Sequence, residues 1–101
     1  MGSHGENSST RGVYASTNST ASNAGAVFVY ERSGASWASK TFVKSSNTDS
    51  KDSFGWGMAI SGDGGTLAVG AYREDSSATG INPTPGTDAT ADENVGAVYL
   101  Y

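Results

Sequence analysis

Residues 52–73 read DSFGWGMAISGDGGTLAVGAYR and carry the clearest structural pattern in the chain. Their first half alternates bulky and small residues, which is the period of a β-strand whose side chains point to opposite faces. The bulky set is Phe54, Trp56, Met58 and Ile60. A glycine-rich turn at 61–65 tolerates positive φ, and the chain returns through 66–71. The pattern predicts a hairpin with one bulky face packed in a core, Trp56 included, and one small face that another layer can approach closely.

The composition indicates one small domain with little core of its own. The chain has 101 residues, of which 36% are hydrophobic, and no cysteine that could form a disulfide. Its net charge is −4 and its six Lys and Arg are scattered, whereas phosphate binding needs clustered positive charge. No apolar run reaches membrane-spanning length. We therefore expect no nucleic-acid and no membrane partner. The many small polar residues fit a parent protein that is extracellular or at the cell surface.

Short apolar runs predict three more strands on either side of this hairpin, and no stretch has helical periodicity. The five expected strands span residues 25–31, 37–45, 54–61, 66–73 and 96–101. Lys40 and Lys44 share one face of the second of these strands, which is typical of an exposed sheet edge.

The segments outside these strands lack the periodicity of a strand or a helix. Residues 1–4, MGSH, look like a vector remnant of a recombinant product and are set apart from the fold. Residues 5–24 are rich in Ser, Thr and Asn and are interpreted as a loop of a preceding repeat. The long acidic segment 74–95 is interpreted as a second loop. The segment from 25 to 101 is then the folded unit.

Two parts of the chain are near copies of each other. GAVFVY begins at residue 25 and GAVYLY at residue 96, and hence 71 residues later. Upstream, ENSSTRGV at 6–13 matches EDSSATGI at 74–81, 68 residues later. The chain thus holds about one and one-third copies of one repeat. Repeats of this length indicate solenoids or propellers, whose units cannot cover their own faces.

The order of short motifs along this repeat is specific. Phe54-Gly55 is followed by Gly70-Ala71 and then by Gly96-Ala97-Val98-Tyr99. This order resembles the FG-GAP repeat of integrin α-subunit β-propellers and their bacterial relatives, with Tyr72 where the motif normally has proline. The resemblance implies an all-β fold of antiparallel four-stranded propeller blades. In such a blade the Phe-Gly segment is the first strand, Gly-Ala the second and Gly-Ala-Val-Tyr the third.

The resemblance also implies that the chain is cut out of phase with the blades. A Trp-containing segment such as residues 37–45 is the fourth strand of a blade, so the chain runs third, fourth, first, second, third. Neither blade is whole. The sequence therefore predicts a propeller assembled by oligomerisation, in which copies of the chain exchange strands and close head-to-tail.

Acidic residues supply weak candidates for a cation site. Many integrin-type repeats bind calcium in the turn between the first two strands, but here Asp63 is the only carboxylate there. Calcium takes six to eight oxygens, so we expect no metal in that turn and no cofactor. Other carboxylates that could gather around calcium flank the hairpin, although ordinary turn and solvated-loop chemistry is the favoured interpretation. They are Asp49, Asp52, Glu74 and Asp75.

The sequence offers no catalytic residues. It has no cysteine, no histidine except His4, no phosphate-binding glycine loop and no zinc-ligand spacing, so we predict that it is not an enzyme. Trp37 begins an outer strand and is a candidate for stacking on a sugar.

Three functions remain open. One is an adhesion-like interaction module whose loops contact another protein, and another is a carbohydrate-binding module assisted by calcium. The third, which the near-integral repeat favours, is an excised or engineered propeller fragment whose measurable property is association with itself.

Overall fold

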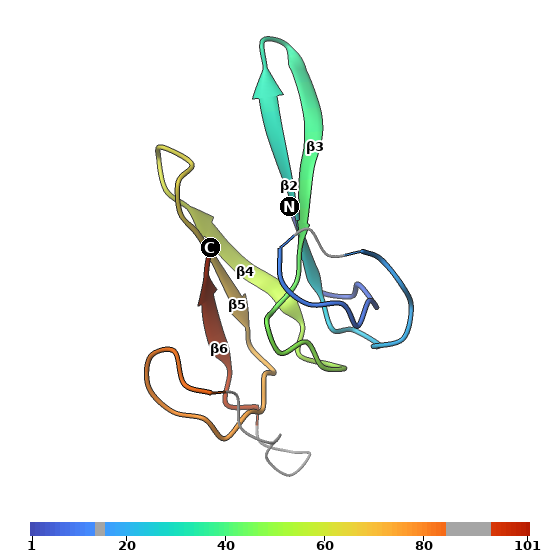
Figure 1. The fold of residues 1–101 in the computed structure, drawn as a ribbon, viewed down its shortest axis with the longest axis vertical. Helices are drawn as coiled ribbons and strands as arrows, with labels where there is room; N and C mark the ends of the chain where they lie inside the picture. The colour runs from blue at the N-terminus through green and yellow to red at the C-terminus, as the bar shows by residue number, and fades with distance from the viewer. Residues whose placement is uncertain (14–15, 85–93) are drawn as a thin grey trace.

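The computed structural model describes residues 1–13, 16–84 and 94–101, and every regular element within them is a β-strand (Figure 1). The strands form two antiparallel three-stranded sheets, ordered β1-β2-β3 and β4-β5-β6. Their bounds are β1 Gly2–Ser3, β2 Ala26–Ser33, β3 Ser36–Val43, β4 Phe54–Ile60, β5 Leu67–Ala71 and β6 Ala97–Leu100. The expected all-β class is confirmed, and the five expected strands are present. The described residues contain no helix long and apolar enough to cross a membrane.

The turn between β4 and β5 is built from small residues, as expected. Gly64 takes a φ of 72°. The carboxylate of Asp63 accepts hydrogen bonds from the Ser61 hydroxyl at 2.6 Å and the Gly65 amide at 2.9 Å. These bonds lower the pKa of Asp63. The residue therefore stabilises its own turn, which is the role that Asp commonly has at such positions.

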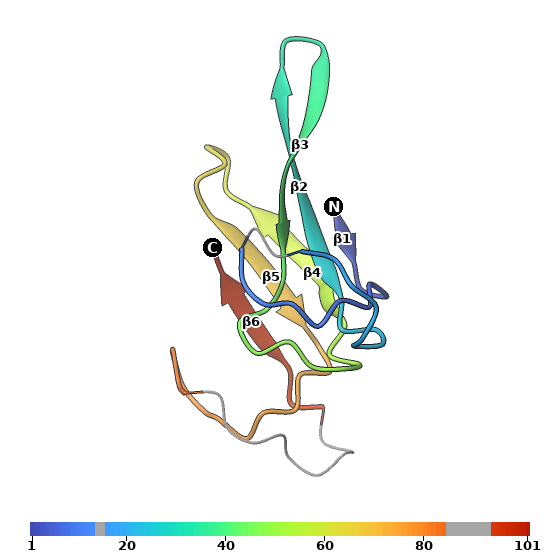
Figure 2. The ribbon, with the colours of Figure 1, turned by 45° about the vertical axis from the view of Figure 1, so that its right-hand side comes forward.

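The β2–β3 hairpin projects beyond the rest of the molecule (Figure 2). Its tight turn uses Gly34 at a φ of 61°. Lys40 and Glu31 form an exposed ion pair at 3.2 Å on the projecting part. Such a pair contributes little to stability in water. The end of this hairpin is thus held by its ladder of backbone hydrogen bonds rather than by packing.

The core lies where the two sheets stack on one another. Its buried members come from both sheets and are Val27, Val43, Phe54, Val69 and Ala71. The Phe54 ring lies edge-on to Tyr99, with centroids 5.4 Å apart. At this junction Gly25 and Phe54 form a parallel bridge, and the Phe54 amide donates to the Ala24 carbonyl at 3.0 Å. This bridge and this hydrogen bond fix the position of one sheet relative to the other.

Residues 1–4 take part in the fold, contrary to the expectation that they stand apart from it. Gly2 pairs with Val27 and Ser3 with Ala26. Met1 extends the pairing, because its amino group donates to the Phe28 carbonyl at 2.6 Å and its own carbonyl accepts from the Phe28 amide at 2.8 Å. Two short backbone pairs therefore suffice to add a third strand to this sheet.

The two sheets repeat one another in register. In the second sheet Gly70 pairs with Val98 and Ala71 with Ala97. These residues lie 68 and 71 positions after the partners in the β1–β2 pair, which are the two spacings of the sequence repeat. In the first sheet, β1 thus occupies the position that the end of β5 occupies in the second sheet, which is that of the second strand of a blade. The chain contains strands two, three and four of one unit and strands one, two and three of the next.

Trp56 is not in the core, so that prediction is wrong for this chain. The ladder pairs Phe54 with Ala71 and then Gly57 with Gly70, which leaves Gly55 and Trp56 in a bulge. Gly55 accommodates the bulge with a φ of 86°. Trp56 is 60% exposed and its ring lies against Tyr72 at 4.8 Å. Period-two alternation fails at this bulge because the extra residues have no partners across the ladder.

The expectation that Lys44 lies on an exposed sheet edge is also wrong. Lys44 does not lie on an exposed edge, because it is completely buried beneath the N-terminal segment. Residues 5–24 form a loop, but the described part of it packs on the sheet, with Ser8 and Ala24 fully buried. The Asn7 carbonyl accepts from the Ala21 amide at 2.7 Å, which closes this loop on itself. Part of the second long loop, residues 85–93, lies outside the described residues.

Candidate functional site

A buried ion pair anchors the first repeat. The Lys44 ammonium lies 3.0 Å from the Glu6 carboxylate and donates a second bond, of 2.5 Å, to the Gly25 carbonyl. The same carboxylate accepts the Ser8 amide at 3.0 Å. Burial lowers the pKa of Lys44, and Glu6 opposes that shift. Burial raises the pKa of Glu6, but hydrogen bonds from Ser8 and Lys44 outweigh it and lower the value.

Glu74 occupies the same place in the second repeat with a different set of partners. Its carboxylate accepts the Ser76 amide at 2.8 Å, and its carbonyl accepts the Gly96 amide at 2.8 Å. Glu6 makes the second of these contacts with Gly25, at 2.9 Å. The remaining Glu74 oxygen accepts from Asn47 at 3.0 Å and Tyr99 at 3.1 Å. Neither ion pair found within residues 1–13, 16–84 and 94–101 involves Glu74.

A groove of about 890 Å³ runs beside the outer edge of β6. Glu74 lines it together with Gly96, with β6, and with the loop that carries Gly80 and Ile81. The β6 strand pairs with β5 alone among the described strands, so its outer edge presents backbone donors and acceptors to the groove. An open edge of this kind is a site for adding a strand.

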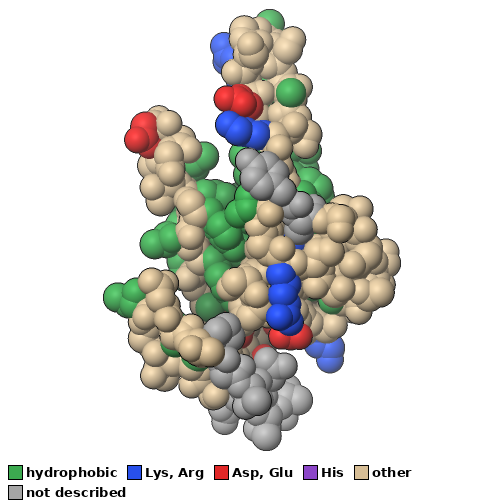
Figure 3. All heavy atoms as spheres, viewed as in Figure 1, with side chains coloured by type: hydrophobic (Ala, Val, Ile, Leu, Met, Phe, Trp, Pro, Cys, Tyr) green, Lys and Arg blue, Asp and Glu red, His purple; other side chains and the backbone are tan. Residues whose placement is uncertain are grey.

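Both faces of the β4-β5-β6 sheet carry exposed apolar side chains. Figure 3 shows hydrophobic side chains gathered over this sheet on the side turned to the viewer. Met58 and Ile60 share a face with Val69 and Leu67, their partners across the ladder. They are 43% and 61% exposed, so the prediction that they pack in the core is also wrong. On the opposite face, Val98 and Leu100 are 73% and 71% exposed. Contiguous exposed apolar surface of this kind marks an interaction site.

A comparison with protein families fits this geometry. The FG-GAP repeat model matches residues 37–83, which run from β3 through β5 and into the following loop. Residues 37–83 form an FG-GAP repeat. The expected family is thereby confirmed for this part of the chain. No curated protein and no solved structure matches the chain.

The FG-GAP repeat is a β-propeller blade module, and such modules are usually non-catalytic. No enzyme family matches the chain. The motif residues lie where two layers meet or where strands pair, so their roles are structural. Phe54 and Ala71 are in the core, Gly55 is in the bulge and Gly70 pairs with Val98. Gly96 directly precedes β6, and Ala97, Val98 and Tyr99 lie in it.

The cation candidates of the FG-GAP repeat are only partly brought together. Asp52 is 2% exposed and accepts the Asp49 amide at 2.9 Å. Burial, together with the charges of Glu74, Asp49 and Asp75, raises the pKa of Asp52 to about 7. In the described part of the chain, no group of three or more acidic or histidine side chains is arranged to hold a metal ion. The strongest electrostatic feature of this region is thus a buried carboxyl beside Glu74.

We expect Asp52→Asn to stabilise the chain at high pH only. The pKa of about 7 lies above the ordinary 3.8, so the stability from protonated Asp52 is present below about pH 4 and is lost as the pH rises through about 7. Asn stays neutral and keeps an acceptor for the Asp49 amide. The free energy of unfolding, from urea titrations, should rise by about 1–3 kcal/mol at pH 8 and little at pH 4.

Asp63→Asn is the matched control for this variant. Asp63 is exposed, and hydrogen bonds lower its pKa rather than raise it. The control should therefore show no gain at pH 8. An equal gain from Asp52→Asn at both pH values would contradict the assignment.

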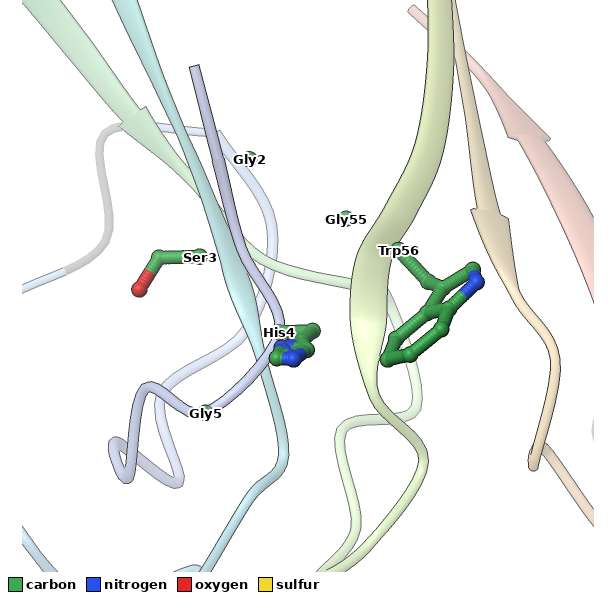
Figure 4. A pocket seen from close by; sticks show the side chains of 6 residues that line it. All are labelled: Gly2, Ser3, His4, Gly5, Gly55 and Trp56. Carbon is green, nitrogen blue, oxygen red and sulfur yellow. The ribbon is translucent and has the colours of Figure 1, made fainter.

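Exposed aromatic residues form a second candidate surface of the FG-GAP repeat. The rings of Trp56 and His4 pack against each other with centroids 4.6 Å apart, and both line a pocket of about 610 Å³ beside β1 and β4 (Figure 4). This pair was not predicted from sequence, because Trp56 has the phase of a core residue and His4 lies in the segment expected to stand apart from the fold. Trp37, the predicted sugar-stacking residue, is 67% exposed near the end of the β2–β3 hairpin.

Proposed function

We propose that this chain is a non-catalytic β-propeller fragment that completes its blades by exchanging strands with copies of itself. The supporting observation is a difference between equivalent residues of the two repeats. Val27 on β2 is 1% exposed because the sheet that follows it covers that face, whereas Val98 on β6 is 73% exposed. The second sheet therefore exposes the apolar face that a following blade would cover, and no such blade is present among the described residues. The parent protein is an extracellular or cell-surface, adhesion-like module whose loops contact a protein ligand.

The two exposed faces of β4 complement each other. One presents the bulky Met58 and Ile60, and the other presents Gly57 and Ala59. In stacked blades the small face of one layer meets the bulky face of the next. The face with Met58 and Ile60 also carries Val69 of the core and already packs in part on the first sheet of the same chain. A first strand supplied to that sheet by another copy would cover the rest of this face, and a copy stacked on the opposite side would bury the small face. Burial contributes roughly 25 cal/mol per Å² of apolar surface.

Strand count supports exchange rather than simple stacking. The first sheet has no first strand within the described residues, and the second sheet has no fourth. A fourth strand from another copy would complete the blade begun by β4 and β5. Such contacts are head-to-tail, and they close into a ring where the rotation between blades permits. Because β2 and β6 fill the same third-strand position, one of them is displaced at each junction.

The mass of the particle in solution tests this proposal. We expect light scattering on the eluted peak to give several times the 10.3 kDa of the chain. Ile60→Asp should return the chain to a folded monomer, because a carboxylate tolerated at an exposed position cannot be buried unpaired in an interface. Ala35→Asp is the control, since Ala35 is exposed in the turn of the β2–β3 hairpin and lies outside the exchanged strand β3. A folded 10.3 kDa monomer that does not change with concentration would refute self-assembly.

The exposed aromatic pocket favours a second candidate, a carbohydrate-binding module. Trp56, with Tyr72 beside it, offers a flat ring surface of the kind on which sugars stack. A glycan array measured with and without a chelator tests this candidate and its calcium dependence together. Binding that Trp56→Ala or Trp37→Ala abolishes would support it, and an array without signal would refute it.

A further inference from the structure

The fourth strand of the first repeat lies in a slot with two backbone walls. On one side Val43 pairs with Val27 of β2. On the other side the Lys44 amide donates to the Gly12 carbonyl at 2.9 Å, and the Gly12 amide donates to the Ser45 carbonyl at 3.2 Å. The floor of the slot is Glu6, which holds the Lys44 ammonium. Residues 43–45 are therefore fixed by backbone pairing on both sides and by one buried charge pair.

The groove beside β6 has the same arrangement as that slot, but none of the described strands lies in it. Gly80 is the counterpart of Gly12, and both have positive φ, of 95° and 78°. Ile81 is the counterpart of Val13 and is 95% exposed, against 44% for Val13. The β6 edge stands where β2 stands in the first slot. Gly80, Ile81 and β6 all line the groove beside β6.

Glu74 is the counterpart of Glu6 at the floor of this groove. It is 3% exposed, although the carboxylate has no lysine or arginine partner among the described residues. Asn47 and Tyr99 donate to one of its oxygens. Both donors are neutral and leave the negative charge uncompensated, close to the buried Asp52. A buried charge without a counter-ion is costly, and a cation at this point would offset that cost.

We propose that residues 43–45 of a second copy of this chain occupy the groove, and that the Lys44 of that copy pairs with Glu74. Its ammonium would take the Gly96 carbonyl as its second acceptor, as Lys44 takes Gly25 within the first repeat. The inference rests on the proposed self-assembly and adds the residue pair that specifies it. It also assigns β6 as the third strand of the shared blade, so that β2 of the second copy is displaced.

The exchange conserves the number of ion pairs. The Lys44 of the second copy leaves its own Glu6, and Glu6 returns to water on the displaced N-terminal segment. Glu74 gains the pair instead. Weakening Glu6 should therefore favour exchange, whereas weakening Glu74 should oppose it. The two glutamates hold equivalent positions, yet their replacement is expected to act in opposite directions.

Glu74→Gln and Glu6→Gln in the full chain form a matched pair for the test. Glutamine keeps one acceptor oxygen for the Ser76 or Ser8 amide, removes the charge, and replaces the other oxygen with an NH2 donor in both variants alike. Sedimentation equilibrium over a range of protein concentrations gives the dissociation constant. We expect Glu74→Gln to raise the constant by about tenfold to hundredfold. We expect Glu6→Gln to leave it unchanged or to lower it. Far-UV circular dichroism checks that both variants are folded.

Each outcome separates this inference from the function on which it rests. A wild-type chain that stays monomeric would overturn both. An oligomer that Glu74→Gln leaves intact would overturn the inference and retain self-assembly. A loss of association in Glu6→Gln alone would show that the N-terminal segment stays in place, and it would overturn the inference in the same way.

Discussion

Phe54→Ala is expected to unfold the chain. Phe54 is 0% exposed and lies between the two sheets, where its ring contacts both Tyr99 and Tyr101. Removing a buried aromatic ring costs about 3–5 kcal/mol, because the lost burial is joined by the cost of the cavity. Domains of this size have a total stability of about 5–15 kcal/mol. The small core described above places this chain near the lower end.

Phe42→Ala is the matched control for Phe54→Ala. Phe42 is only half-buried and packs against Phe28 at 5.0 Å on the β2–β3 hairpin, outside the buried core. Its removal should cost about 1 kcal/mol. Urea titrations followed by far-UV circular dichroism give both values. Equal losses in the two variants would show that the junction between the sheets is not the source of stability.

The strands could be predicted from sequence because their pattern is local. Alternation between Phe54 and Ile60, and a glycine turn after it, fix a hairpin without any knowledge of the rest of the chain. The expected bounds of the hairpin, 54–61 and 66–73, lie close to the observed Phe54–Ile60 and Leu67–Ala71. The spacing of the repeat could also be read from local sequence, since GAVFVY and GAVYLY are near copies.

Features that depend on contacts between distant residues could not be predicted in this way. Lys44 looks like an edge lysine until Glu6, 38 residues away, is placed over it. Trp56 has the phase of a core residue, but the bulge removes it from the ladder. Gly2–Ser3 has no strand signal of its own and pairs only because β2 offers an edge. In each case a partner remote in sequence overrides the local pattern.

Gly25→Ala is expected to destabilise the chain far more than Gly96→Ala, although the two glycines are equivalent in the repeat. Both have positive φ, of 84° and 76°, so each alanine costs about 1–2 kcal/mol for its backbone conformation. At Gly25 the added Cβ would also lie 2.1 Å from the Phe54 carbonyl oxygen. Backbone atoms cannot yield as a flexible side chain can, so the total loss should reach about 2–5 kcal/mol. Urea titration of dilute, monomeric protein measures both.

The same two variants report which copy of the third strand an assembled blade uses. Among the described residues of the single chain, a Cβ at Gly96 would meet nothing closer than the Tyr72 carbonyl oxygen at 3.5 Å, because none of them forms a layer beyond β6. If β6 forms the junction with the next copy, its Gly96 must approach the Phe54 backbone of that copy as Gly25 does within the chain. Gly96→Ala should then abolish association while the monomer stays folded. If β2 keeps its place and β6 is displaced, Gly96→Ala should associate like the wild type. Light scattering on the folded variant separates these outcomes, because the one atom added at Gly96 is harmful only where a second chain lies against it.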